Sequence, residues 1–182
     1  MSMIAFHSIL EDSESNPVTS FHITGGYQGL LEGTYTLIPY YCDVANCDCR
    51  EVWVEIIQTE KSDDGLTKIV GDSLAFIDYG WDSPEFYAKR KKTSTGNTDF
   101  PGVYLDIDNS PSEHAETLLE LFISAILENE DFRCRLEEQY YDFKFRIKEM
   151  TKNDPPLIVS LPPDFQPASF LPSFRKKRMK LR

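Results

Sequence analysis

Histidine is scarce in this sequence, which holds three in 182 residues, at positions 7, 22 and 114. A Ser-His-Asp or Cys-His catalytic set needs a histidine as general base, and none of the three stands in a persuasive order with such partners. The glycine-rich segment 25–29 lacks the lysine of a phosphate-binding loop, so it is interpreted as a turn. The sequence therefore offers no complete set of residues for a recognisable reaction.

Long apolar runs are also missing. None approaches the roughly 20 residues of a membrane span, and the first 12 residues lack the basic region of a signal peptide. We therefore expect a cytoplasmic protein with no membrane partner. In a reducing compartment, closely spaced cysteines are more often metal ligands or redox groups than structural disulfides.

Positive charge is sparse and unevenly placed. Six of the 19 basic residues lie in 175–182, which leaves 13 basic against 30 acidic residues elsewhere, a charge of −17. An acidic body repels phosphate backbones, so nucleic acid is not expected as its partner. The basic end can contact an acidic surface, including that of its own body, or nucleic acid.

The length fits one domain with tails. We predict a flexible leader over 1–20, a single α+β domain with a cysteine cluster over 21–150, and a proline-rich tail with a basic end over 151–182. Six prolines between 155 and 172 leave little regular structure possible there. The tail 155–182 is interpreted as an extended linker or as a peptide that docks on a protein partner.

Four segments dense in β-branched and aromatic residues predict strands: 34–41, 50–59, 67–79 and 103–107. Gly71 and Asp72 are expected to interrupt the third segment, which forms one or two strands. Strands that follow one another along the chain predict an antiparallel meander. The expected sheet has about four to five strands.

Helical signals surround the last strand. Ser83 and Pro84 predict the start of a short helix, and Ser110 with Glu113 predicts a capping box before a longer one. Apolar residues then recur at steps of three and four, with a break at Asn129; these positions are Ala115, Leu118, Leu119, Phe122, Ile126, Phe132, Leu136, Tyr140, Phe143, Ile147 and Met150. The predicted fold class is α+β: an antiparallel sheet followed by two long amphipathic helices packed on it.

Three cysteines, Cys42, Cys47 and Cys49, fall within eight residues between two predicted strands. An extended chain places Cys47 and Cys49 on the same side, and the turn 43–46 returns Cys42 to within reach. Converging thiolates are what soft tetrahedral metals require, and zinc is the first choice. Iron–sulfur clusters usually need four cysteines. A redox or disulfide role, and a cluster without any cofactor, remain alternatives.

The fourth ligand decides between a closed structural site and an open catalytic one. Candidates are His22, His114, Cys134, Asp43 and Asp48. The favoured hypothesis is a non-catalytic protein-interaction module closed by structural zinc. The alternative is a metal-dependent hydrolase that uses an open zinc site or a magnesium ion held by aspartates; these aspartates are Asp78, Asp82, Asp106 and Asp108.

A resemblance follows from three motifs: Tyr-Cys-x4-Cys-Asp-Cys-Arg over 41–50, Tyr-Gly-Trp over 79–81, and Leu-Asp-x5-Ser-Glu over 105–113. Over 33–148 the chain resembles a group of small uncharacterised bacterial proteins. The resemblance implies a metal-binding module without an assigned activity. Those proteins carry a His-Tyr pair where this chain has Tyr140-Tyr141, so no histidine ligand is expected from that helix.

Overall fold

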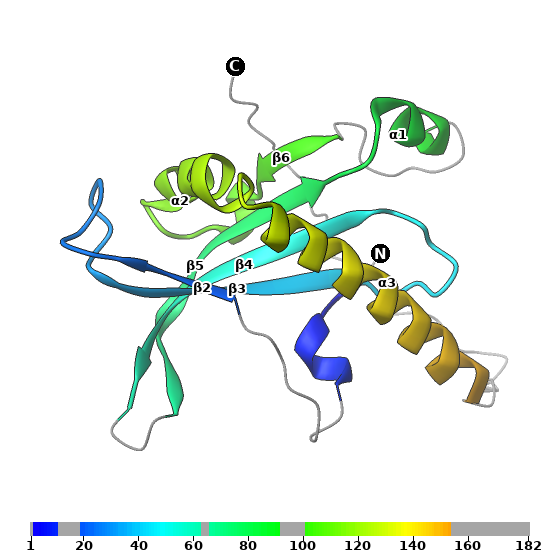
Figure 1. Ribbon diagram of the computed structural model, residues 1–182, viewed down its shortest axis with the longest axis horizontal. Helices are drawn as coiled ribbons and strands as arrows, with labels where there is room; N and C mark the ends of the chain where they lie inside the picture. The colour runs from blue at the N-terminus through cyan, green and yellow to red at the C-terminus, as the bar shows by residue number, and fades with distance from the viewer. Residues whose placement is uncertain (1, 11–18, 63–65, 92–100, 154–182) are drawn as a thin grey trace, which may run out of the picture.

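The computed structural model describes residues 2–10, 19–62, 66–91 and 101–153 (Figure 1). One six-stranded antiparallel sheet lies at its centre, made of β1 (Met3–Ala5), β2 (Thr19–Ile23), β3 (Gly33–Cys42), β4 (Glu51–Lys61), β5 (Thr67–Gly80) and β6 (Gly102–Leu105). The helices are α1 (Pro84–Lys91), α2 (Ala115–Leu121) and α3 (Glu130–Asn153), with short 3₁₀ turns η1 (Phe6–Ile9) and η2 (Ile107–Asn109) and a π-helical turn η3 (Phe122–Ile126). The predicted α+β class is confirmed.

Strands β3 to β6 form the predicted meander, because each pairs antiparallel with the next along the chain. The expected irregularity at Gly71 is present within one continuous β5. Pairing shifts between Ile56 opposite Ala75 and Gln58 opposite Val70, so β5 contains extra residues at this point. Gly71 has φ +77°, a conformation that glycine adopts without a steric penalty.

The first two strands both pair with the outer edge of β3. Residues Met3 to Ala5 run beside Cys42 to Tyr40, and β2 pairs with the opposite half of β3. Residues 3–9, which fall in the predicted flexible leader, form β1 and η1. Their apolar side chains join the core, where the ring of Phe6 packs edge-on against Tyr41 at a centroid distance of 6.1 Å. Residues 11–18 lie outside the described ranges.

Only one of the two helices predicted to be long is long. Helix α2 has seven residues and continues into the π turn η3, whereas α3 has 24. The π turn is closed by the Leu127 amide, which donates to the Phe122 carbonyl at 2.9 Å. The Ser124 hydroxyl donates to the Glu120 carbonyl at 2.7 Å. A hydroxyl bonded to this carbonyl competes with the regular i→i−4 backbone bond, which explains the local change of helix type.

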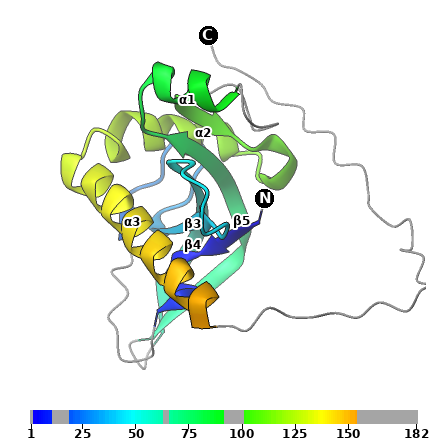
Figure 2. The ribbon, with the colours of Figure 1, turned by 90° about the vertical axis from the view of Figure 1, so that its right-hand side faces the viewer.

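Helices α2 and α3 cover the same face of the sheet (Figure 2). The predicted helical core positions are buried, with Ile126 half-buried and Met150 as the exception. Met150 is 53% exposed because the last turns of α3 run beyond the sheet (Figure 1). The predicted break at Asn129 is confirmed, and its side chain accepts a hydrogen bond from the Phe132 amide at 3.0 Å, which caps α3.

The capping box predicted at Ser110 and Glu113 does not form. The Ser110 hydroxyl instead accepts a hydrogen bond from the Phe76 amide at 2.9 Å and donates to the Asp106 carbonyl at 2.6 Å. These bonds fix the segment against β5, and α2 begins only at Ala115. No helix among the described residues is long and apolar enough to cross a membrane. The predicted tail, 155–182, lies outside the described ranges.

Candidate metal centre

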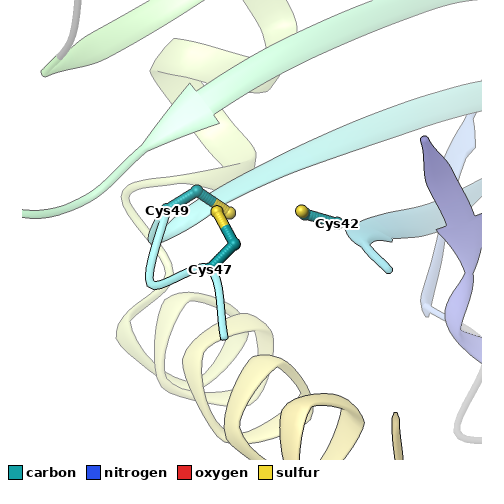
Figure 3. Close-up of side chains that lie close together, drawn as sticks. All are labelled: Cys42, Cys47 and Cys49. Atoms are coloured by element: carbon teal, nitrogen blue, oxygen red, sulfur yellow. The ribbon is translucent and has the colours of Figure 1, made fainter. Parts of the chain in front are cut away.

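The three cysteines of the motif converge at one end of the sheet (Figure 3). Cys42 is the last residue of β3, and Cys47 and Cys49 lie in the loop before β4. Their sulfur atoms all lie within 4.8 Å of one another, as the spacing predicted. Cys42 and Cys49 are fully buried, whereas Cys47 is half-buried. Among the described residues, no histidine, carboxylate or further cysteine joins this group.

Backbone bonds shape the loop that carries the cysteines. The Cys47 amide donates to the Val44 carbonyl at 2.9 Å, which closes a turn between the first two cysteines. The Asp43 amide donates to the Ser2 carbonyl at 3.2 Å, so the segment beside β1 also supports the loop. The residue after Cys49, Arg50, has φ +51°. This left-handed conformation costs a non-glycine residue about 1–2 kcal/mol, so neighbouring contacts must hold it.

Arg50 is held from both sides of its backbone. Its amide donates to the Tyr140 hydroxyl of α3 at 3.3 Å, and its carbonyl accepts from the Tyr87 hydroxyl of α1 at 2.6 Å. Its guanidinium forms ion pairs with Asp48, at 3.1 Å, and with Asp82. Two helices and two carboxylates therefore fix the chain directly after Cys49, and with it the direction of the Cys49 side chain.

A buried lysine lies beside the cluster. Lys144 of α3 is 7% exposed, and its ammonium donates to the carbonyls of Cys42, at 2.7 Å, and Val44, at 3.1 Å. It also lies over the Tyr140 ring, 5.6 Å from the centroid. No carboxylate in the described residues pairs with it within salt-bridge distance. A buried ammonium is costly unless a negative charge compensates it, and a thiolate at the neighbouring Cys42 can supply that charge.

The thiols share their protons unequally. A hydrogen bond from Cys49 lowers the pKa of Cys42, and the Val44 amide and the Lys144 charge act in the same direction against the effect of burial. The same bond raises the pKa of Cys49, which burial and the charge on Cys42 raise further. Without a metal, the cluster therefore holds a thiolate at Cys42 that is stabilised by a protonated Cys49.

The donor set fits a soft tetrahedral metal ion. Zinc–sulfur bonds of about 2.3 Å place tetrahedral sulfurs about 3.8 Å apart, which lies within the observed limit of 4.8 Å. Three thiolates and one divalent ion carry a net charge of −1. With such an ion bound, the ammonium of Lys144 would balance that charge in the buried site.

The predicted fourth ligands lie elsewhere or are already engaged. His22 is exposed on β2, where its Nδ1 lies 3.2 Å from the Thr34 hydroxyl. His114 packs against the loop at Gly29, and Cys134 is exposed on α3. Asp43 and Asp48 adjoin the cysteines in sequence but lie outside the group of close ligand atoms. One Asp48 oxygen accepts from the Tyr140 hydroxyl at 3.1 Å.

A cavity of about 300 Å³ opens beside the cluster. It is lined by Cys47 and Asp48 of the loop, by Arg50, and by residues of α3 that include Tyr140, Lys144 and Lys148. Tyr140 was predicted from the sequence as a core position, whereas Lys144 was not among the predicted site residues. A signal for Lys144 existed, because it lies four residues after Tyr140 on the apolar face of the predicted helix.

The aspartates considered for magnesium do not gather. Asp78 is buried in β5, and Asp82 pairs with Arg50. One Asp106 oxygen accepts a hydrogen bond from the Asn109 side chain at 2.8 Å. Among the described residues, the cysteines form the only group of three or more potential ligands within metal-binding distance.

No protein-family model matches the chain, and neither a curated protein nor a solved structure matches it.

Proposed function

We propose that this protein binds one zinc ion through Cys42, Cys47 and Cys49, and that the ion stabilises a non-catalytic interaction module. The convergence of three cysteine sulfurs within 4.8 Å carries the proposal. The adjacent ammonium of Lys144 supports it, because a buried cation offsets the cost of burying thiolate charge and so favours thiolates over three neutral thiols.

The ion would act as a cross-link. It would join the end of β3 to the loop before β4, and the contacts of Lys144 and Arg50 would extend that link to α3. Because the three ligands come together only in the folded chain, the free energy of metal binding adds to the stability of the fold. The interaction role comes from the sequence, in which the tail 155–182 is interpreted as an extended linker or as a peptide that docks on a protein partner.

A metal-dependent hydrolase is the second candidate. The cavity beside Cys47 favours it, since a metal with three protein ligands has a position for water, and Asp48 lines the same cavity. The Asp48 carboxylate, however, already accepts hydrogen bonds from Arg50 and Tyr140. These bonds stabilise the ionised carboxylate and weaken it as a general base, which places the structural role first.

The metal content of the purified protein tests the proposal. Elemental analysis of untagged protein, prepared without chelator, should give about one zinc per chain. Replacing one ligand in the variant Cys47→Ser should remove most of the zinc and lower the melting temperature. The variant Cys134→Ser is the matched control, because Cys134 is an exposed cysteine outside the cluster.

Each outcome has a defined meaning. Equal losses of zinc in the two variants would show that binding is not specific to the cluster. Protein without zinc, iron or copper, whose melting temperature does not rise on addition of zinc, would refute the proposal. Iron or copper in place of zinc would keep the site and change the metal.

A further inference from the structure

The proposed metal would have one coordination position that the described residues do not fill. Three cysteines supply three donors, whereas zinc takes four in a tetrahedral site. Cys42 and Cys49 are 0% exposed, but Cys47 lines the cavity of about 300 Å³. A ligand from outside the protein would therefore reach the metal from the Cys47 side, through this cavity.

The three sulfur donors determine which outside atom binds well. Thiolates transfer electron density to the metal, so the metal becomes a weaker partner for hard oxygen ligands and retains its preference for sulfur. A thiol can lose its proton to solvent as its sulfur binds, and no change of oxidation state is needed. The donor set thus favours an outside thiol over a carboxylate.

The cavity also carries positive charge in a strongly acidic protein. Lys144, Lys148 and Arg50 all line it, in a chain with a net charge of −11. Arg50 is paired with Asp48 and Asp82, and Lys144 balances the proposed metal site. Lys148 forms no ion pair with any carboxylate in the described ranges, so its ammonium is available to a ligand in the cavity.

We propose that this cavity binds a small acidic thiol, whose sulfur completes the coordination of the metal and whose carboxylate contacts Lys148. The proposal rests on the zinc site proposed above. A volume of about 300 Å³ lies at the lower limit of the roughly 300–1,000 Å³ typical of ligand pockets, which fits a compact ligand. The class is therefore a low-molecular-weight thiol with one carboxylate close to its sulfur.

The full-length protein loaded with cobalt(II) gives a direct readout. Cobalt takes the same tetrahedral thiolate sites, and its sulfur-to-metal charge-transfer absorption increases with each added thiolate. The probe is 3-mercaptopropionate, with propionate testing the sulfur and 2-mercaptoethanol testing the carboxylate. We expect a saturable increase with 3-mercaptopropionate, none with propionate, and weaker binding of 2-mercaptoethanol.

Variants of two lysines test the contact with the carboxylate. Lys148→Gln should weaken 3-mercaptopropionate binding by about two- to fivefold, the effect of one partly exposed ion pair, and should leave 2-mercaptoethanol binding unchanged. Lys68→Gln is the control, because Lys68 is an exposed lysine on β5 outside the cavity. A general effect of lost positive charge would appear in both variants.

The outcomes separate the two proposals. Failure of the protein to bind cobalt or zinc overturns the metal site and the thiol site together. A bound cobalt whose spectrum does not respond to 3-mercaptopropionate, or which the thiol removes from the protein, overturns the thiol site alone. An equal response to propionate overturns the preference for sulfur, and equal affinity for 2-mercaptoethanol overturns the carboxylate contact.

Discussion

Replacement of the buried lysine beside the cysteines should weaken metal binding more than any other change outside the ligands. Lys144 is 7% exposed, and its ammonium donates to the carbonyls of Cys42 and Val44. The variant Lys144→Met keeps most of the aliphatic volume and removes the ammonium. In the proposed zinc site, three thiolates and the ion carry a charge of −1. The variant leaves that charge buried without its compensating cation.

The size of the effect follows from Coulomb's law. Two unit charges separated by about 4 to 8 Å interact by about 2 to 4 kcal/mol at an effective dielectric constant of about 20. Since about 1.4 kcal/mol is a factor of ten in affinity, the zinc dissociation constant should increase by about 30- to 700-fold. Screening by solvent reduces this little, because the ammonium is buried.

Competition with a chromophoric chelator measures the affinity. Circular dichroism must first show that the metal-free Lys144→Met variant is folded. This check is needed because the carbonyls of Cys42 and Val44 also lose a charged hydrogen-bond donor, and that loss destabilises the fold itself. Lys144→Arg retains the positive charge and should restore most of the affinity, and Lys68→Met controls for the lost charge at an exposed site. A folded Lys144→Met protein that binds zinc within about threefold of the parent would refute the role of Lys144 as counter-charge.

Two further predictions concern stability. The buried Tyr41 hydroxyl donates to the Leu136 carbonyl at 2.8 Å, so Tyr41→Phe should lower the free energy of unfolding by about 1 kcal/mol in urea denaturation. Tyr141 is exposed, so the control variant Tyr141→Phe should change the free energy of unfolding by close to zero. Equal changes in the two variants would contradict the stabilising role of the Tyr41 hydrogen bond. The Ser83 amide and the Arg50 guanidinium hold the pKa of Asp82 below its usual 3.8. A carboxyl whose folded pKa is depressed contributes stability above its unfolded pKa and loses it as the pH falls through the folded value. The stability difference between the parent and Asp82→Asn should therefore be constant above about pH 5 and shrink below pH 3.8, and a difference independent of pH would rule out this linkage.

Local patterns were enough to predict much of the sheet. The predicted strands 34–41 and 50–59 agree within two residues with β3 and β4. The agreement is close because strand preference depends on β-branched residues and on alternation between neighbouring positions, both of which are visible in a short stretch of sequence. The pairing of β1 and β2 with β3 was missed, since an edge strand depends on a partner elsewhere in the chain. The π turn η3 was also missed. It depends on the hydrogen bond from the Ser124 hydroxyl to the Glu120 carbonyl, which the spacing of apolar residues does not reveal.

The convergence of the cysteines is predictable from their spacing along the chain. Cys42, Cys47 and Cys49 are separated by so few residues that a strand, a turn and an extended segment bring their sulfurs near one another, and the contacts of Arg50 with Tyr87 and Tyr140 then fix the direction of Cys49. The surroundings of the cysteines depend on how distant segments pack. Lys144 is 102 positions from Cys42, and it reaches the cluster because the packing of α3 on the sheet buries one apolar face and carries the lysine with it. The compensation of the thiolate charge by Lys144 and the cavity beside Cys47 both follow from the packing of α3 on the sheet. The residues close to the cysteines in sequence do not determine that packing.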